Sequence, residues 1–270
     1  MSLYSTSVRP LLFRLDPETA HRGAIGRGAR LGWAAGAMRA ITHIDRPRLE
    51  TRIAGLRFPT PIGLAAGFDK SGTAIAALAA LGFGSVEIGS VSIDPSAGNP
   101  KPRLWRLPQD EAIVVHYGLP NDGASAIATR LARTHVPVPL GINIVVTNRG
   151  PGAAPLAADG IIGEYVAASR LLAPCADYLM LNLSCPNTVD GRDFFADRAH
   201  LDACLDAFAD IELHLPVFLK ISPLGGVAAI ERVLAASSGR AFISGFMFNL
   251  PPVKPEGMRT PGSIWRGMPG

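Results

Sequence analysis

The stretch "YLMLNLSCPNT", residues 178–188, joins a short apolar run to a dense group of hydrogen-bonding residues. Its first half has the length and apolar character of a strand that is buried on both faces. The strand ends in two amides, two hydroxyls and a thiol, which belong to Asn182, Asn187, Ser184, Thr188 and Cys185. A buried strand that ends in so many polar groups predicts a binding site at its carboxyl end.

The same pattern recurs along the chain. Short apolar segments end in small or polar residues, and a helical stretch follows most of them. The predicted strands are residues 61–66, 84–89, 139–146, 177–183, 216–221 and 241–248. The predicted helices lie near residues 70–82, 122–134, 158–173, 198–213 and 225–237, and a hairpin-like lead-in occupies residues 48–60. This alternation predicts an α/β fold with a parallel sheet, foremost a TIM (β/α)8-type barrel, with a doubly wound open sheet as the alternative.

The sequence contains fewer predicted strand-helix units than a closed barrel needs. Only 22 residues follow Phe248, and they are rich in glycine and proline. Two further strand-helix units would need roughly 60 residues, at about 30 residues per unit. We therefore expect an incomplete barrel of about six βα units in residues 45–270.

Residues 1–44 differ from the rest and predict a helical extension. Asp16 is a plausible N-cap, with Pro17 at the first helical position. Leucines alternate with arginines before this break, which is typical of a basic amphipathic segment that lies on a membrane surface. Composition alone favours the alternative, a helical arm that packs on its own domain.

Composition excludes several classes of protein. Hydrophobic residues make up 48% of the 270 residues and charged residues 18%, so the chain can bury a large core. The net charge of +4 is mild, and no block of Lys or Arg indicates nucleic-acid binding. Cys175, Cys185 and Cys204 have no metal-ligand spacing and predict free thiols. No apolar run reaches about 18 residues, so we expect no membrane-spanning helix.

The carboxyl ends of parallel strands meet on one rim, so the residues found there should form one site. These ends carry two lysines, a serine and three amides, namely Lys70, Lys220, Ser90, Asn143, Asn182 and Asn249. Side-chain amides both donate and accept, which suits a heterocycle with alternating N–H and C=O groups. A lysine beside such a ring stabilises negative charge on it. Taken singly, a strand-end lysine is more often a solvated charge, and a lone cysteine is more often an inert core thiol.

The segments that carry these residues resemble one known family. "GLAAGFDK", "VEIGSVS…GNPKPRLWRL", "LGINI", "NLSCPNT" and "FLKISP" are similar to the motifs of dihydroorotate dehydrogenase. The N-terminal "RPLLFRLDPETAH" is similar to the quinone-dependent, membrane-associated class 2 enzymes of that family. The resemblance runs from about Leu3 to the C-terminus. It implies a (β/α)8 barrel that holds FMN, and a helical pair at a quinone tunnel.

The resemblance also implies roles for individual residues. Contacts to FMN fall to Ala66, Gly67, Ser90, Asn143, Asn182 and Lys220. Contacts to dihydroorotate fall to Lys70, Asn182, Asn187, Thr188 and Asn249. His21 and Arg106 would line the quinone entrance. The implied location is the cytoplasmic face of the inner membrane, with the protein bound peripherally.

The reaction implied is the oxidation of dihydroorotate to orotate in pyrimidine biosynthesis, with a quinone as the final acceptor. Cys185 stands at the position of the base that removes the C5 proton. Class 2 enzymes mostly carry serine there and class 1 enzymes carry cysteine. A free thiol has a pKa of about 8.5, far closer to neutrality than a hydroxyl, so Cys185 is chemically able to act as the base.

Four departures from the family pattern bear on this function. Val115 replaces a substrate-binding asparagine, with Leu119 replacing a nearby aromatic residue. Val146 stands where a basic residue is usual, and Leu250 replaces a threonine after Asn249. The glycine-rich turns that hold the phosphate in the last two βα units do not follow. We therefore expect the 270-residue chain alone to bind FMN poorly.

Two alternatives to dihydroorotate oxidation stay open. The chain could be a related flavin oxidoreductase that acts on another pyrimidine-like ring. The replacement of the family's asparagine by Val115 somewhat favours this hypothesis. It could also be a non-catalytic relative. All three hypotheses share the same fold and differ in whether flavin binds and which dihydropyrimidine reduces it.

Overall fold

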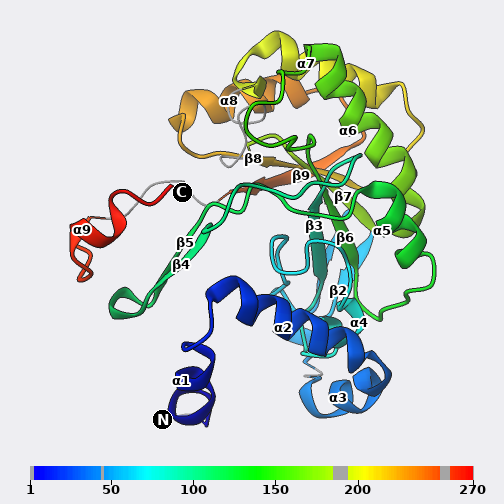
Figure 1. Ribbon diagram of the computed structural model, residues 1–270. Coiled ribbons are helices and arrows are strands. Elements are labelled where there is room, and N and C mark those ends of the chain that lie inside the picture. Colours follow the sequence, from blue (N-terminus) through cyan, green and yellow to red (C-terminus); the bar gives the residue numbers. More distant parts are fainter. Residues whose placement is uncertain (1–2, 44–45, 185–193, 250–255, 270) are drawn as a thin grey trace.

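A parallel β-sheet forms the centre of the molecule (Figure 1). The computed structural model describes residues 3–43, 46–184, 194–249 and 256–269. Five parallel strands pair in the order β3-β6-β7-β8-β9. They comprise β3 (Val86–Val91), β6 (Leu140–Ile144), β7 (Tyr178–Asn182), β8 (Val217–Ile221) and β9 (Ile243–Phe248). Each falls within two residues of a strand predicted from the apolar runs.

The first predicted strand, residues 61–66, is much shorter than expected. Only Leu64 forms a parallel bridge, to Val86 of β3. The Leu64 N–H donates to Ser85 O at 2.9 Å, and the Leu64 carbonyl accepts from Glu87 N at 2.8 Å. Pro61 has no N–H to donate, so it cannot extend the ladder toward the amino end. The segment therefore extends the sheet beyond β3 as an edge of minimal length.

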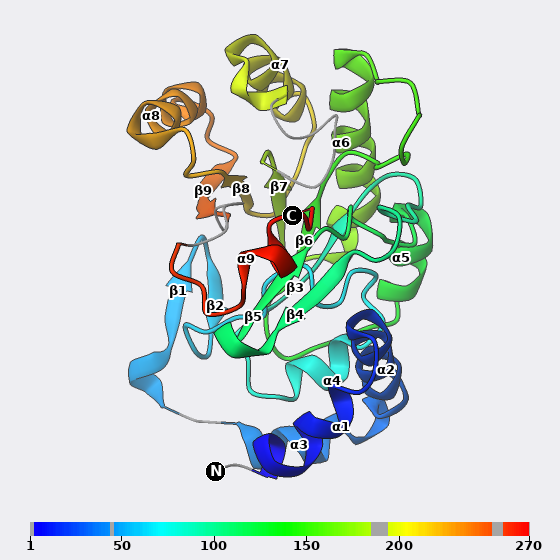
Figure 2. The same ribbon diagram turned by 60° about the vertical axis from the view of Figure 1, so that its left-hand side comes forward.

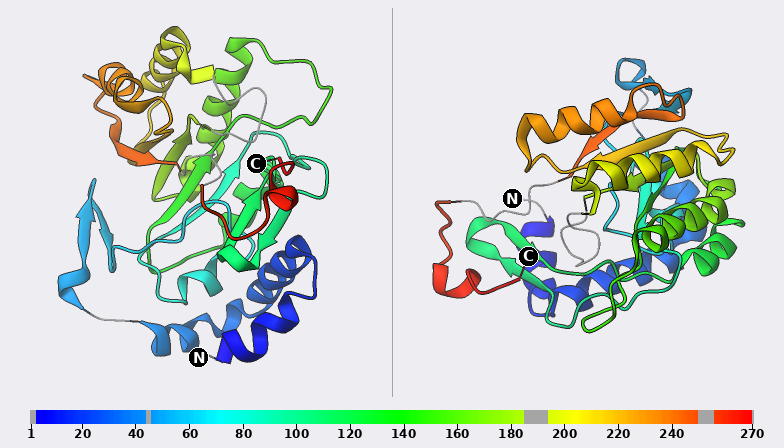
Figure 3. Two further views of the ribbon diagram at one scale, coloured as in Figure 1. Left: turned by 90° about the vertical axis from the view of Figure 1, so that its left-hand side faces the viewer. Right: turned by 90° about the horizontal axis from the view of Figure 1, so that it is seen from above.

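Helices cover one face of this sheet (Figures 1 and 3). They are α4 (Ile75–Ala79), α5 (Ala124–Leu131), α6 (Ala158–Leu172), α7 (Arg198–Ala209) and α8 (Gly226–Ser237). In α6 the buried side chains recur at helical spacing, as Ile161, Tyr165, Ala168 and Leu172 show. These side chains and those of one face of each strand form a single apolar core.

Helix α4 begins later than the predicted residues 70–82. The Asp69 carboxylate accepts from Thr73 N at 2.9 Å and from Ala74 N at 2.7 Å. A side chain that binds backbone N–H groups in this way competes with helical hydrogen bonding and favours a turn. Residues 70–74 are therefore turns, and the helix begins at Ile75.

The arrangement is that of a barrel rather than a doubly wound sheet. In a doubly wound sheet the strand order reverses at a switch point, and helices cover both faces. Here the strands follow one another in sequence order, and the apolar core lies between the helices and one face only. The predicted α/β barrel-type architecture is confirmed.

Two antiparallel hairpins accompany the sheet. The first pairs β1 (Thr51–Ile53) with β2 (Leu56–Phe58), as the lead-in predicted. The second, β4 (Leu104–Leu107) with β5 (Ala112–Val115), was not predicted. Its turn contains Asp110, whose carboxylate accepts from Arg259 N at 2.6 Å and from Thr260 N at 3.0 Å. These bonds hold the segment that contains α9 (Gly262–Trp265) against the hairpin, as Figure 2 shows.

The N-terminal helices lie at the end of the molecule opposite α7 and α8 (Figures 1 and 2). They are α1 (Arg9–Leu12), which follows a π-helical turn at Tyr4–Val8, α2 (Pro17–Arg30) and α3 (Ala35–Thr42). The predicted cap is confirmed, since the Asp16 carboxylate accepts from Thr19 N at 2.9 Å. The domain boundary predicted after residue 44 stays a prediction.

Candidate active site

The two faces of the central sheet differ in chemistry. Side chains on the helix-facing side are aliphatic, among them Ile142 of β6 and Leu181 of β7. Because successive side chains in a strand point to opposite faces, the alternate positions face the concave side. Those positions hold polar residues on neighbouring strands, namely Glu87, Asn143, Asn182 and Lys220. A polar stripe across four buried strands needs a partner or a ligand, because unpaired buried polar groups are costly.

A hydrogen-bonded chain joins three of the predicted site residues. The Ser90 hydroxyl donates to Asn143 Oδ1 at 2.5 Å, and Asn182 Nδ2 donates to Ser90 Oγ at 3.3 Å. All three residues are buried. They come from β3, β6 and β7 and meet at the carboxyl ends of those strands. The structure therefore brings together side chains that lie far apart in the sequence, as the strand-end argument predicted.

The rim continues onto the next two strands. Lys220 is paired in register with Asn182, and its carbonyl accepts from the Ser184 hydroxyl at 3.3 Å. Asn249 Nδ2 donates to the Ser184 carbonyl at 3.1 Å, just beyond the end of β9. Asn249 therefore lies at the same rim as Lys220. Cys185, Asn187 and Thr188 lie outside the described residues, directly after Ser184, as does Leu250 after Asn249.

The loop after the first predicted strand reaches the rim from the other side. The Gly67 N–H donates to Gly89 O at 2.8 Å, so Ala66 and Gly67 lie beside the end of β3. Lys70 Nζ donates to Gly67 O at 2.6 Å and sits 4.0 Å from the centroid of the Tyr117 ring. Burial lowers the pKa of Lys70 to about 8, with the positive charge of Arg103 adding to this shift against the opposing charge of Glu18.

The two predicted quinone-access residues occupy different places. His21 of α2 packs edge-on against Phe68 and lines a cavity of about 590 Å³ that Lys70 and Tyr117 also line. Burial is the main cause that lowers the pKa of His21. Arg106 of β4 instead lies against the N-terminal turn, where its guanidinium donates to Leu12 O at 3.2 Å and Leu15 O at 3.0 Å. Arg106 does not line the cavity that contains His21.

Four contributors to this region were not singled out from the sequence. Glu87 accepts from Asn143 Nδ2 at 3.0 Å and from the Tyr178 hydroxyl at 3.3 Å. Glu18 and Arg103 form a buried pair beside the cavity, with Arg103 Nη2 and Glu18 Oε1 2.8 Å apart. The one visible signal was Glu87, a charged residue inside the apolar run "SVEIGS". The Glu18–Arg103 pair spans 85 positions, so no local pattern indicates it.

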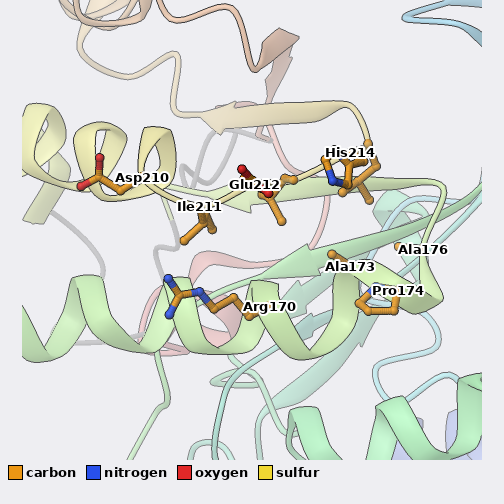
Figure 4. Close-up of a pocket in the computed structure, with 10 residues that line it drawn as sticks. Arg170, Ala173, Pro174, Ala176, Asp210, Ile211, Glu212 and His214 are labelled. Carbon is orange, nitrogen blue, oxygen red and sulfur yellow. The ribbon is translucent and has the colours of Figure 1, made fainter.

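A second cavity, of about 540 Å³, lies at the opposite end of the sheet (Figure 4). Arg170 at the end of α6 and the loop between α7 and β8 line it, with Asp210, Glu212 and His214 in that loop. Figure 4 shows these charged side chains spread along the loop and helix. None of the predicted site residues is among those that line it. In barrels the amino ends of the strands generally serve stability, so the site is at the other rim.

The described part of the chain contains no cluster of three His, Cys, Asp or Glu side chains that could hold a metal ion. The polar rim instead offers hydroxyl, amide and ammonium groups. Groups of these kinds are suited to a planar organic ring with donors and acceptors along its edge.

Comparisons with known proteins agree with this geometry. The family model for dihydroorotate dehydrogenase matches residues 48–246. A dihydroorotate dehydrogenase (quinone) of Mycobacterium marinum is 40% identical over 261 residues, which covers 94% of this chain and 69% of that protein. The enzyme of the same name from Kineococcus radiotolerans is 40% identical over 273 residues and covers 97% of this chain and 73% of that protein.

Solved structures give the same answer. The ligand-free DHODH from Eimeria tenella superposes with a TM-score of 0.73 at 27% identity, covering 88% of this chain and 72% of that one. The complex of that organism's DHODH with ferulenol gives a TM-score of 0.72 at 28% identity, covering 92% and 70%. The strands of the parallel sheet follow sequence order, the polar residues meet at one rim, and the family model and relatives match most of the chain. The chain therefore belongs to the dihydroorotate dehydrogenase family.

Proposed function

We propose that this protein oxidises (S)-dihydroorotate to orotate with FMN and passes the electrons to a quinone, in pyrimidine biosynthesis. The observation that carries the proposal is the rim on which Ser90, Asn143 and Asn182 form one hydrogen-bonded chain. Lys70 and Lys220 approach that rim from its two sides. The 40% identity to dihydroorotate dehydrogenases that use a quinone supports both the substrate and the acceptor.

The donor set fits a flavin ring. One serine hydroxyl, two amides and the Lys220 ammonium provide both donors and acceptors for the N–H and C=O groups of the ring edge. Gly67 has a φ of +108°, and a Cβ placed there would meet no atom within 4 Å. The backbone of Ala66 and Gly67 is therefore open to close approach by a flat ligand. We assign FMN contacts to Ala66, Gly67, Ser90, Asn143, Asn182 and Lys220.

Dihydroorotate is an anion, and the ammonium group of Lys70, which lines the cavity beside this rim, suits its carboxylate. Lys70 has a pKa of about 8, so it is mostly protonated at neutral pH. The Gly67 carbonyl, 2.6 Å from Lys70 Nζ, fixes the direction of the ammonium group. Asn182 and Asn249 offer amides to the pyrimidine ring from the adjacent strand ends. Asn187 and Thr188 complete the proposed substrate set on the grounds of sequence alone.

The proposed reaction balances with one base. The thiolate of Cys185 takes the proton from C5 of dihydroorotate while hydride leaves C6, and the C5–C6 double bond of orotate forms. The chemistry that FMN supplies when bound is acceptance of that hydride and delivery of its two electrons to a quinone. Positioned general bases contribute about 10²–10⁴-fold to such proton transfers. The low pKa of a thiol relative to a hydroxyl makes Cys185 suited to this step near neutral pH.

The N-terminal helices are the proposed route for the quinone. Leu11, Trp33 and Ile41 expose 62%, 85% and 86% of their surface, respectively, and arginines flank them. A basic segment that presents large apolar side chains suits a peripheral membrane surface. None of the helices in the described ranges has the length and hydropathy that crossing a membrane requires. We propose peripheral binding at the cytoplasmic face of the inner membrane, with His21 and Arg106 near the quinone path.

One observation favours a second candidate, the oxidation of a different dihydropyrimidine. Val115, where the family pattern has a substrate-binding asparagine, ends β5 and pairs with Leu104. It cannot donate or accept a hydrogen bond through its side chain. A substrate that lacks a polar group at this point would lose nothing from the replacement. Val146, another of the replaced positions, is fully buried in the apolar core and away from the polar rim.

The test is anaerobic reduction of the flavin. Because the 270-residue protein is expected to bind FMN weakly, FMN is supplied at a concentration that saturates it. The visible flavin absorption should then fall when dihydroorotate is added and recover when a soluble quinone follows. Reduction by other dihydropyrimidines but not by dihydroorotate would establish the second candidate instead. A protein that binds FMN but is reduced by none of these compounds would contradict both.

A further inference from the structure

Glu87 is the one carboxyl group on the concave face of the described sheet, and its surroundings are unusual for a charge. It is 2% exposed and is the second residue of β3. Below it lies an apolar cavity of about 360 Å³ lined by Met180, Phe218 and Met247. Above it lies the polar rim. A carboxyl group placed between an apolar cavity and a polar network needs hydrogen-bond partners on both oxygens.

Both oxygens have partners. Asn143 Nδ2 donates to Oε1 at 3.0 Å, and the Tyr178 hydroxyl donates to Oε2 at 3.3 Å. The backbone N–H of Ala66 adds a third interaction. Burial raises the pKa of Glu87, while the charge of Lys220 and the bonds from Asn143 and Tyr178 oppose that shift. A proton on Oε2 would leave Oε1 an acceptor, so the bond from Asn143 survives in either protonation state.

This acceptor determines which way the Asn143 amide faces. A side-chain amide has its donor and its acceptor on opposite sides, so an Nδ2 turned to Glu87 turns Oδ1 toward Ser90. The Ser90 hydroxyl then donates to Oδ1 at 2.5 Å, which leaves its oxygen free to accept from Asn182 Nδ2 at 3.3 Å. Every bond in the chain from Asn182 to Glu87 points in one direction. If the Asn143 amide were turned over, its Oδ1 would face the Glu87 carboxylate, and two acceptors would lie against each other.

We propose that Glu87 is a positioning residue for the flavin site, which fixes the orientation of the Asn143 and Asn182 amides through Ser90. The inference rests on the proposed function in one respect, the assignment of these amides to the flavin ring. It adds that the orientation of these amides is fixed by a residue that touches neither cofactor nor substrate. Amides held in one orientation bind a ring edge more tightly than amides free to turn.

The test separates the geometry of Glu87 from its charge. Glu87→Gln removes the charge but keeps an oxygen that accepts from Asn143 and an amide that donates to Tyr178. Glu87→Asp keeps the charge but withdraws the carboxylate by one carbon–carbon bond, out of reach of Asn143. The readout is the affinity for lumiflavin, which carries the flavin ring without a phosphate, followed by fluorescence quenching. Unfolding curves of each variant establish that it is folded.

We expect Glu87→Gln to bind lumiflavin within about threefold of the unmodified protein and Glu87→Asp to bind about tenfold more weakly, the effect of one lost hydrogen bond. The side-chain amide protons of Asn143 should remain protected from solvent exchange in the Gln variant and lose that protection in the Asp variant. Asp177→Asn is the matched control, because Asp177 accepts from Leu140 N at 2.7 Å at the other end of the sheet. Its lumiflavin affinity should not change.

Three results would overturn the proposal. If Glu87→Asp binds like the unmodified protein and Glu87→Gln binds weakly, the charge matters and the orientation does not. If neither variant differs, or if the unmodified protein binds no lumiflavin, Glu87 positions nothing for a flavin. Normal lumiflavin binding with no reduction by any dihydropyrimidine would contradict the proposed function alone and leave the role of Glu87 standing.

Discussion

At the scale of single residues, replacement of the proposed base tests the mechanism most directly. Cys185→Ala should slow the reduction of bound FMN by dihydroorotate about 10²–10⁴-fold, because no group would take the C5 proton. Stopped-flow absorbance of the flavin measures this step separately from reoxidation by quinone. Cys204→Ala is the matched thiol control, since Cys204 is buried in the apolar core between helix and sheet and should have no effect on this rate. An unchanged rate in Cys185→Ala would assign the base elsewhere.

Lys70 carries a pH dependence whose sign follows from its environment. Its pKa is lowered to about 8, chiefly by burial, so the ammonium loses its proton as the pH rises through that value. Anion binding at Lys70 needs the charged form, so the affinity for orotate should fall as the pH rises above about 8. Titration of the FMN-reconstituted protein with orotate across this range measures the effect. Lys70→Gln should bind orotate weakly with no such inflection, and a steep pH dependence in that variant would point to another group.

At the scale of elements, a buried ion pair attaches α2 to the segment before β4. Arg103 donates to both Glu18 oxygens, at 3.1 and 2.8 Å, and to the Ala97 carbonyl at 2.6 Å. Removing one member leaves the other charge buried, which costs about 3–5 kcal/mol. Glu18→Gln should therefore lower the free energy of unfolding by an amount of that order at neutral pH, as urea unfolding would measure.

The same pair predicts a loss of stability in acid. The hydrogen bonds from Arg103 lower the pKa of Glu18 below its ordinary 4.5. A group whose pKa is depressed in the folded state stabilises it above the ordinary pKa, and this contribution is lost as the pH falls through the depressed value. The unmodified protein should therefore lose stability more steeply below about pH 4.5 than Glu18→Gln does. Parallel curves for the two proteins would show that Glu18 is not the group responsible.

A close approach between β6 and β7 supports the interior network. Gly141 faces the ring of Tyr178 on the concave side, and a Cβ added there would collide with it. Gly141→Ala should cost about 1–3 kcal/mol of stability, typical of overpacking, and should displace the hydroxyl that donates to Glu87. Urea unfolding measures the first effect and lumiflavin affinity the second. Gly163→Ala, at a helical position with no atom within 4 Å of the added Cβ, is the control.

Some strands of this fold can be predicted from the sequence and others cannot. The parallel strands were predictable because each is a continuous apolar run, and the rim residues followed from the rule that strand ends converge. The hairpin of β4 and β5 was not, because its strands are only four residues long and only partly buried, and Arg106 interrupts the first. The role of Glu87 depends on which face of β3 points inward and on Asn143, 56 positions away. Such distant pairings leave no local signal.

At the scale of the whole molecule, large exposed apolar side chains occur at two opposite ends. Trp33 and Ile41 are the most exposed of the large apolar side chains in α3 and the turn before it. The same N-terminal segment carries the exposed arginines Arg14, Arg22 and Arg30. Leu224 and Val227, at the start of α8, are also exposed but lie at the opposite end of the molecule (Figure 2). If the N-terminal helices bind membranes, only the first pair should matter.

Vesicle binding tests this difference. Trp33→Ser with Ile41→Ser should weaken binding to vesicles that contain an anionic phospholipid by roughly 10²- to 10⁴-fold, since burying each such side chain contributes about 1.5–3 kcal/mol and the two effects add. Leu224→Ser with Val227→Ser should bind as the unmodified protein does, and sedimentation of the protein with vesicles measures both. Added salt should weaken binding of the unmodified protein, because arginines attract the anionic surface through a screened interaction. Equal losses in the two double variants would mean that exposed apolar area in general, and not the N-terminal helices, drives the association.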